Sequence, residues 1–224
     1  MLDERLQRVS EFITGRKMLD IGSDHAYLPI EAVSRGIVQY AICGEVVKGP
    51  YESTVRNIER ENMTDRIEAR FGSGLEVAKP EDAVDTVTIC GMGGPLIADI
   101  LQSGFDHLGG FSRLVLQANT HTYPIRKVLV ALGYEIIEET VIQDGHHFYE
   151  IIVAEAGDAD YDEAALTFGP ILLEKREPAF TRKLERELEH QQNIYQNLRN
   201  NSSNTQRLKE VSDTIHTLKE VLEQ

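Results

Sequence analysis

The sequence predicts an α/β protein with a mostly parallel sheet, followed by a helical hairpin. From residue 1 to about 156, short apolar segments alternate with amphipathic ones, which favours a parallel sheet with helices on both faces. Two apolar segments near the end of this region have no helix between them, which predicts an antiparallel hairpin at one sheet edge. Beyond about residue 160, apolar residues recur only at helical spacing. We therefore expect two domains, 1–156 and 157–224.

The expected strands are short apolar runs that end in glycine or a polar residue. They cover residues 18–22, 40–45, 67–71, 84–90, 114–117, 134–141 and 148–154. Asp144 and Gly145 have the composition of the turn between the last two. The expected helices are an opening one built on Leu2, Leu6, Val9 and Ile13, then 26–36, 50–62, 95–102 and 123–132.

The tail predicts an antiparallel pair of helices. One apolar seam runs from Phe180 to Leu198 and a second from Leu208 to Leu222, with a polar turn at 200–204 between them. Pro178 suits the start of the first helix, and Ser203 with Gln206 resembles a capping box that opens the second.

Composition narrows the class of protein. The chain has 224 residues, 41% hydrophobic and 27% charged, which is typical of a globular protein. No apolar run is long enough to cross a bilayer, and the opening residues lack the features of a secretory signal. Cys43 and Cys90 end apolar runs, as expected for reduced thiols in the core of a cytoplasmic protein. We expect no metal site and no membrane partner. The oligomeric state is left open, with a monomer as the default.

The turn after the first strand, Asp20 to Ala26, is the first candidate site. A dinucleotide-binding turn has glycine two and five positions after Gly22, but this chain has Asp24 and Tyr27 there. A second carboxylate in the turn would repel a pyrophosphate, whereas a ligand with an ammonium or sulfonium group would suit it. Methionine-derived cofactors have both groups. The alternative is an ordinary turn in which Asp24 caps the next helix.

The ends of the next four strands also carry candidate ligand-binding residues. Glu45 ends the second strand, where a carboxylate can accept hydrogen bonds from ribose hydroxyls. Gly72–Ser73–Gly74 and Gly91–Met92–Gly93–Gly94 follow the third and fourth strands and would let a ligand approach the backbone. Simple tight turns are the alternative for both. Asn119, after the fifth strand, offers a donor and an acceptor to the edge of a base.

Together these segments resemble a known family. The run from Asp20 to Pro29, with Gly44 to Val47, Gly91 to Gly94 and Leu116 to Asn119, is similar to the bacterial tRNA (adenine(22)-N1)-methyltransferases. The similarity covers about residues 1–155, and the tail is similar to the coiled coil of that family. Ala118 stands where the family usually has proline, and Ser73 where it often has Asp or Asn.

The resemblance implies a Rossmann-like, class I methyltransferase fold that binds S-adenosylmethionine. In that fold Glu45 holds the ribose and residues 72–74 line the adenine of the cofactor. We assign cofactor binding to Asp20, Gly22, Ser23, His25, Glu45, Val46, Gly72, Ser73, Gly74, Cys90, Gly91, Met92 and Gly93.

The implied reaction methylates N1 of adenine 22 in tRNA. Adenine N1 already has a lone pair, so catalysis depends on positioning and electrostatics. We predict that Asp24 stabilises the charge that develops on the ring, that Asn119 orients the base edge and that Tyr27 packs on the base.

The charge of the chain argues against RNA binding as a property of the whole surface. The formal net charge is −14, whereas nucleic-acid binders usually have a basic balance. A local basic face suffices, and we assign Arg113, Arg126 and Lys127 to it. A denser basic cluster at 175–186 is interleaved with Glu, as on any solvated helix.

Three alternatives remain open from the sequence. The first is a methyltransferase that acts on another RNA or on a small molecule. The second is a non-catalytic module that binds S-adenosylmethionine and interacts through the hairpin. The third, a nicotinamide oxidoreductase, is disfavoured because the glycine pattern is absent.

Overall fold

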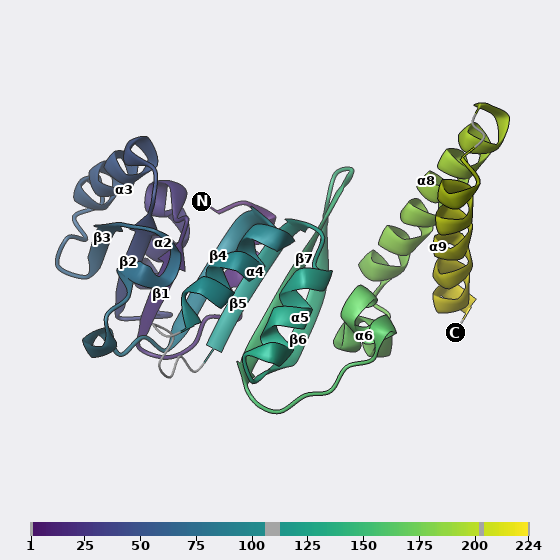
Figure 1. The fold of residues 1–224 in the computed structure, drawn as a ribbon. Coiled ribbons are helices and arrows are strands. Elements are labelled where there is room, and N and C mark those ends of the chain that lie inside the picture. The colour runs from purple at the N-terminus through teal and green to yellow at the C-terminus, as the bar shows by residue number, and fades with distance from the viewer. Residues whose placement is uncertain (1, 106–112, 202–203, 224) are drawn as a thin grey trace. The chain divides into compact units, whose positions relative to one another are not determined.

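The computed structural model describes residues 2–105, 113–201 and 204–223. The chain forms two compact units, 1–171 and 172–224. The first contains a seven-stranded sheet and its covering helices, and the second is helical (Figure 1).

The sheet of the first unit has the strand order β3-β2-β1-β4-β5-β7-β6. The strands are β1 (Lys17–Ile21), β2 (Tyr40–Glu45), β3 (Ile67–Phe71), β4 (Thr86–Gly93), β5 (Arg113–Thr120), β6 (Tyr134–Asp144) and β7 (His147–Ala156). Neighbours pair in parallel except β7, which runs antiparallel to both β5 and β6. The predicted mostly parallel sheet with an edge hairpin is confirmed, and within that hairpin the antiparallel strand lies next to β5.

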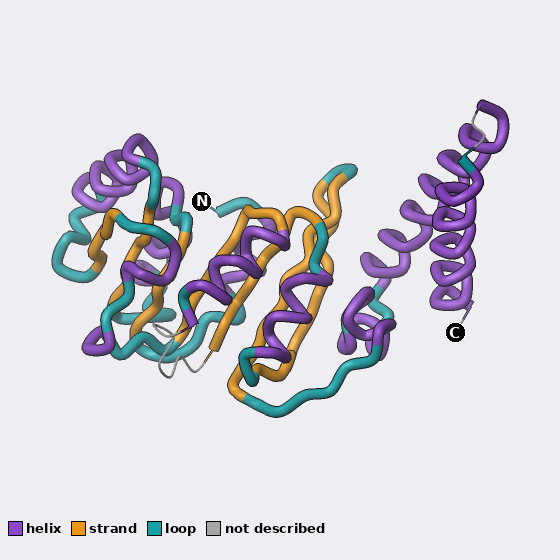
Figure 2. Tube along the Cα trace, viewed as in Figure 1, coloured by secondary structure: helices purple, strands orange, loops and turns teal. Residues whose placement is uncertain are grey.

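Helices cover both faces of this sheet, as alternating apolar segments predict. They are α1 (Glu4–Ser10), α2 (Tyr27–Ser34), α3 (Lys48–Arg60), α4 (Gly94–Ser103), α5 (Tyr123–Ala131) and α6 (Glu163–Phe168), with short 3-10 turns η1 (Asp24–Ala26), η2 (Gly74–Val77) and η3 (Pro80–Asp82). Helices α4 and α5 lie side by side on the face toward the viewer in Figures 1 and 2.

Two apolar cores result, one on each face. Leu19 and Ile21 pack with residues of α4 and α5, whereas Met18, the neighbour of Leu19 in the chain, packs with residues of α1, α2 and α3. This alternation is the period of two that a strand buried on both faces requires. Ile97, Leu101, Ile125 and Leu129 fill the first core, and Val9, Leu28, Val33 and Ile58 the second.

The second unit is the predicted antiparallel hairpin. Helix α7 (Pro170–Lys175) spans the boundary between the units, and α8 (Pro178–Asn201) and α9 (Thr205–Glu223) pack along each other. Phe180 and Leu184 of α8 and Val211, Leu218 and Val221 of α9 are buried. Pro178 begins α8 as predicted. The predicted capping box at Ser203 lies outside the described residues. None of the described helices has the length and apolarity needed to cross a membrane.

Strands β4 and β5 are longer than predicted. Residues 91–93, expected as a turn, continue β4 with shifts of register against β5. Strand β5 continues to Thr120, which carries Asn119 on a strand end rather than in a free loop. Hydrogen bonds from a neighbouring strand therefore hold both segments.

Candidate active site

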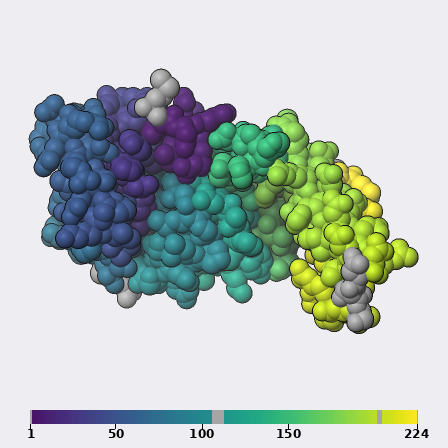
Figure 3. All heavy atoms as spheres, turned by 90° about the horizontal axis from the view of Figure 1, so that it is seen from above, coloured from purple at the N-terminus to yellow at the C-terminus, as the bar shows by residue number. Residues whose placement is uncertain are grey.

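A cavity of about 480 Å³ opens at the carboxyl ends of the central strands. This is where parallel α/β sheets bind ligands, and the volume lies within the usual range for small-molecule sites. Figure 3 looks down on this end of the sheet, where the N-terminal segment lies beside the β6–β7 hairpin. The lining residues are Asp3, Arg5, Leu6, Asp20, Gly22, Ser23, Asp24, Tyr27, Leu28, Cys90, Gly91, Met92, Asn119, Asp144 and Tyr149.

The turn after β1 has an unusual backbone. Gly22 has φ +70°, and three consecutive residues without glycine's freedom, Asp24, His25 and Ala26, have φ of +24°, +70° and +57°. Left-handed conformations cost free energy for residues with a Cβ, and such strain concentrates at functional sites. This finding also excludes the alternative of a simple capped turn, because Ser23 and Ala26 precede η1 and α2 without side-chain capping bonds.

Glu45 connects this turn to the end of β2. Its Oε1 accepts a 2.6 Å hydrogen bond from the backbone N–H of Asp24. Burial raises the pKa of Glu45 above its ordinary value, with the Asp24 N–H opposing the shift. The second carboxylate oxygen has capacity for further donors.

Asp20 is a buried carboxylate below the turn. Ser23 Oγ donates to its Oδ2 at 2.6 Å, and Thr88 Oγ1 donates to its Oδ1. Burial raises the pKa of Asp20 to about 6, while the two hydroxyl bonds lower it and Glu45 raises it further. The carboxylate has two hydroxyl donors and no salt bridge to a described residue, so a cationic ligand in the cavity would stabilise its ionised form.

Gly91, Gln117 and Asn119 form a closed ring of hydrogen bonds at one wall of the cavity. The Gly91 N–H donates to Gln117 Oε1 at 2.9 Å, and Gln117 Nε2 donates to Asn119 Oδ1 at 3.2 Å. Asn119 Nδ2 then donates to the carbonyl of Gly91 at 2.8 Å. The ring fixes the amide of Asn119 within the site.

Glycine is required at two of these strand ends for different reasons. A Cβ on Gly22 would lie 2.2 Å from Met92 Cε, so this glycine brings the backbone against a residue of the cavity. A Cβ on Gly94 would lie 1.7 Å from the carbonyl oxygen of His121. Gly94 therefore allows α4 to pack against the segment after β5, which is a structural role.

The predicted cofactor residues are distributed over the cavity and its rim. Asp20, Gly22, Ser23, Cys90, Gly91 and Met92 line the cavity, together with the predicted catalytic residues Asp24, Asn119 and Tyr27. The other predicted cofactor residues do not line it: His25, Glu45, Val46, Gly72, Ser73, Gly74 and Gly93. Of these, Glu45 reaches the site through Asp24, and Gly72 donates to the Glu45 carbonyl at 2.9 Å. His25 stacks on Tyr27 with ring centroids 5.3 Å apart.

Two of the three basic residues assigned to RNA are placed where they do not fit that role. Arg126 is fully buried, where its guanidinium pairs with Glu139 and Glu150. Arg113 starts β5, at the end of the sheet opposite the cavity, and pairs with Glu155. No local pattern in the sequence indicates that these cations pair with carboxylates of the same chain. Lys127 is exposed on α5.

Sequence reasoning missed residues that reach the cavity from distant segments. Asp3 and Arg5 come from the N-terminal segment, and Asp144 and Tyr149 from the β6–β7 hairpin. The guanidinium carbon of Arg5 lies 5.7 Å from the centroid of the Tyr149 ring. No motif marks these residues, because their proximity depends on how α1 packs beside β6.

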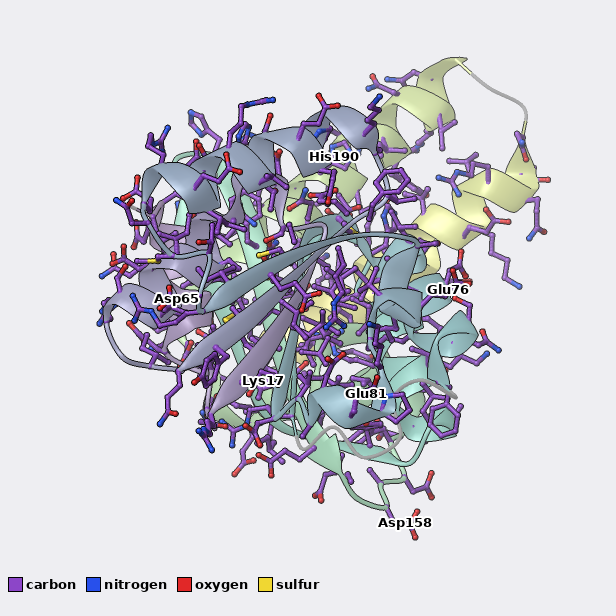
Figure 4. The ribbon with its side chains drawn as sticks, turned by 90° about the vertical axis from the view of Figure 1, so that its left-hand side faces the viewer. Lys17, Asp65, Glu76, Glu81, Asp158 and His190 are labelled. Carbon is purple, nitrogen blue, oxygen red and sulfur yellow. The ribbon has the colours of Figure 1, made fainter. Side chains whose placement is uncertain are left out.

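A second cavity, of about 420 Å³, lies at the opposite end of the sheet. Its lining includes Lys17, Tyr40 and Arg66 at or beside the starts of β1, β2 and β3, and Figure 4 labels Lys17 and Asp65 of that lining. Arg70 there bonds to Asp82 and to the carbonyl of Val77. The described residues that line this cavity include none with a positive φ, and their one buried carboxylate, Asp82, is paired with Arg70. We therefore place the candidate active site at the carboxyl ends.

Comparisons with known proteins agree with the sequence resemblance. The sequence model of the family described as tRNA (adenine(22)-N(1))-methyltransferase matches residues 18–220. The Bacillus subtilis protein of that name is 43% identical over 232 residues, covering 99% of this chain and 97% of the relative.

Two solved structures with bound cofactor are also similar. A proposed tRNA (m1A22) methyltransferase of Streptococcus pneumoniae in complex with S-adenosyl-L-methionine is 38% identical, with a TM-score of 0.91 and coverage of 99% and 100% of the two chains. The Mycoplasma capricolum TrmK in complex with S-adenosyl-homocysteine is 26% identical, with a TM-score of 0.89 and coverage of 100% and 98%. The predicted fold class and family are thus confirmed: the chain belongs to the tRNA (adenine(22)-N(1))-methyltransferase family.

Proposed function

We propose that the cavity at the carboxyl ends of the sheet holds S-adenosylmethionine beside an adenine, and that its residues direct methylation of adenine 22 of tRNA at N1. Family membership makes the chain an S-adenosylmethionine-dependent tRNA methyltransferase. The observation that carries the site assignment is the acidic, strained turn after β1, which faces Gly91 and Met92 across one cavity.

The residues present fit this cofactor. It has a cationic sulfonium and an ammonium group, and the cavity is lined by four carboxylates, those of Asp3, Asp20, Asp24 and Asp144. The buried Asp20 has a pKa raised to about 6, as expected of a carboxylate that lacks a cationic partner. A cation bound nearby would supply that partner. Gly22, without a side chain, leaves room for Met92, which lines the cavity.

Glu45 and the turn would hold the ribose and adenosine of the cofactor. The Asp24 N–H already occupies one oxygen of Glu45, which orients the other for ribose hydroxyls. Val46, directly after β2, and Phe71, at the end of β3, have exposed apolar side chains that are 60% and 59% accessible. We assign the adenine to this apolar rim, beside Gly72–Ser73–Gly74.

The base to be methylated would enter from the side of Tyr27, Asn119 and Tyr149. When bound, the cofactor supplies an electrophilic methyl group. Among the described residues Asn119 Oδ1 accepts one bond, from Gln117, so it has capacity to accept another from the exocyclic amine of adenine. Tyr27, half exposed, offers a ring face to the base. The base must leave its stack in the RNA to reach this depth, at a cost of roughly a few kcal/mol.

Asp24 would stabilise the positive charge that methylation places on the base. Its carboxylate lines the cavity and is 72% exposed, with His25 Nε2 3.5 Å away. A preorganised negative group near a developing cation lowers the barrier without itself taking a proton from N1. The exocyclic amine later loses a proton to solvent or to this carboxylate.

The two units differ in charge in a way that matters for RNA. Residues 172–224 contain nine basic and nine acidic residues, so the net charge of −14 belongs entirely to residues 1–171. The described hairpin residues contribute none of the large exposed apolar side chains, so no apolar stripe favours an interaction module. We assign Lys127 and the 175–186 cluster as candidate phosphate contacts, and we place the reaction in the cytoplasm with its tRNA.

Methyl transfer to unmodified tRNA tests the function. Labelled S-adenosylmethionine is incubated with two tRNAs that differ only by adenine or guanine at position 22. Incorporation into the adenine form alone is expected. Incorporation into both would assign another acceptor position, and incorporation into neither, with cofactor binding intact, would reject the tRNA substrate.

A further inference from the structure

Arg5, on the N-terminal helix α1, contacts the hydrogen-bonded ring that holds Asn119. Its Nη1 donates to Gln117 Oε1, the same oxygen that accepts the Gly91 N–H. The Arg5 side chain is 18% exposed and also donates to Asp3 Oδ2 at 3.3 Å. Arg5 thus lies between the cavity and the ring.

The donors in this arrangement determine which way each amide points. Two donors, the Gly91 N–H and the Arg5 guanidinium, converge on one atom of Gln117, so that atom is the oxygen. The NH₂ group of Gln117 must then face Asn119 and meets its Oδ1. Asn119 is left with its NH₂ toward the Gly91 carbonyl, which accepts it.

The reversed orientation would leave several groups unsatisfied. If Gln117 were flipped, its NH₂ would face two donors. Asn119 would then flip as well and direct its oxygen at the carbonyl oxygen of Gly91. Unpaired polar groups at such positions are costly. Without Arg5, Gly91 alone opposes the two flips, through its N–H at Gln117 and its carbonyl at Asn119.

We infer that Arg5 is a positioning residue for methyl transfer: through Gln117 it fixes the carboxamide of Asn119 with its oxygen available to the acceptor base. This inference rests on the proposed function of Asn119. Arg5 itself does not have to touch the base or the phosphates of the RNA.

The test compares Arg5→Met with Arg5→Lys, by steady-state methylation of tRNA. Arg5→Met keeps the length of the side chain and removes the donor, and it should lower kcat by roughly tenfold to a hundredfold, as loss of a charged hydrogen bond allows. KM for tRNA and the Kd for S-adenosylmethionine should stay within roughly twofold. Arg5→Lys retains a donor and should recover most of kcat.

A double-mutant cycle with Asn119→Ala separates positioning from other roles. In that background Arg5→Met should have little further effect on kcat, because the group that it positions is gone. Arg8→Met, on the same helix, is the matched control, since Arg8 forms a salt bridge with the nearby Glu11 and lies over the ring of Phe12. Its kcat should equal that of the wild type.

Other results would overturn the inference. Arg5 would be an RNA ligand instead if Arg5→Met changed only KM for tRNA. The salt dependence of tRNA binding would then be shallower by about one phosphate contact. Additive effects in the cycle would exclude action through Asn119. If Arg5→Met is unstable by thermal melting, Arg5→Gln replaces it in the test. Gln is shorter and uncharged, so this variant must show part of the same kcat-specific loss. A wild-type protein without tRNA methylation would reject the proposed function itself, which is a different outcome.

Discussion

The backbone N–H of Asp24 donates a 2.6 Å hydrogen bond to Oε1 of Glu45, so a carboxylate at the end of β2 holds the turn after β1. The bond joins residues 21 positions apart in the chain. It also occupies one of the two carboxylate oxygens of Glu45, which leaves the other to accept hydrogen bonds from a ligand.

Glu45→Gln should weaken S-adenosylmethionine binding by roughly tenfold to a hundredfold, because a neutral amide is a weaker acceptor for both the Asp24 N–H and ribose hydroxyls. Isothermal titration calorimetry without tRNA measures this. Glu76→Gln, an exposed change in η2 labelled in Figure 4, is the control and should bind like the wild type. Equal affinities for the two variants would remove Glu45 from the cofactor site.

Cofactor affinity should depend on pH through Asp20. The pKa of Asp20 in the ligand-free protein is raised to about 6 by burial, and a cationic ligand favours the ionised form. Affinity should therefore fall as pH decreases below about 6, by at most about tenfold per unit. Asp20→Asn should bind more weakly at pH 8 and lose this dependence. A wild-type affinity that stays constant from pH 8 to 5 would show that no cation binds beside Asp20.

The same residue predicts an opposite effect on stability. Because the pKa of Asp20 in the folded protein is above its ordinary value of 3.8, ionised Asp20 opposes folding above pH 6, and this cost disappears as pH falls toward 3.8. Asp20→Asn should thus raise the free energy of unfolding at pH 8, by on the order of 1–3 kcal/mol, and have little effect near pH 4. Denaturant unfolding at the two pH values measures the difference.

Gly22→Ala should reduce cofactor affinity more than its backbone strain explains. The new Cβ would lie 2.2 Å from Met92 Cε, which must move into the cavity. Gly36→Ala is a matched control, because Gly36 also has φ +70° but no atom within 4 Å of the Cβ position. Both variants should lose about 1–2 kcal/mol of stability from the left-handed backbone. Only Gly22→Ala should bind the cofactor poorly, and similar binding by both would contradict the assignment.

Asp24→Asn should lower the rate of methyl transfer while cofactor binding is retained. The substitution keeps the backbone bond to Glu45 and removes the negative charge that we expect to stabilise the methylated ring. We expect kcat to fall by roughly a hundredfold, within the usual range for such electrostatic groups. Single-turnover methylation of tRNA measures the step, and unchanged turnover would reject the role.

Arg126→Met should destabilise the first unit rather than weaken RNA binding. Arg126 pairs with Glu139 and Glu150 in a fully buried cluster and donates to the carbonyls of Leu166 and Thr167. Removal of one partner from a buried ion cluster costs about 3–5 kcal/mol. Thermal and denaturant unfolding test this, with Lys127→Met, an exposed neighbour, as the control for stability.

Local sequence patterns are sufficient to predict the alternation of strands and helices, the edge hairpin and the tail hairpin. These features depend on periodicity and turn residues, which are local. Such patterns also predict that Asp20, Gly22 and Asn119 lie at one site, because parallel strands must bring their carboxyl ends to one edge of the sheet. All three line the cavity.

Which side chains from distant segments face one another depends on the three-dimensional packing of the chain. From the sequence, Arg113 and Arg126 are expected to bind RNA, but carboxylates on β6 and β7 pair with them. Arg5 and Tyr149 carry no motif, yet the packing of α1 beside β6 brings them to the cavity. Such contacts arise from packing between residues at least 13 positions apart in the chain, and no local pattern encodes them.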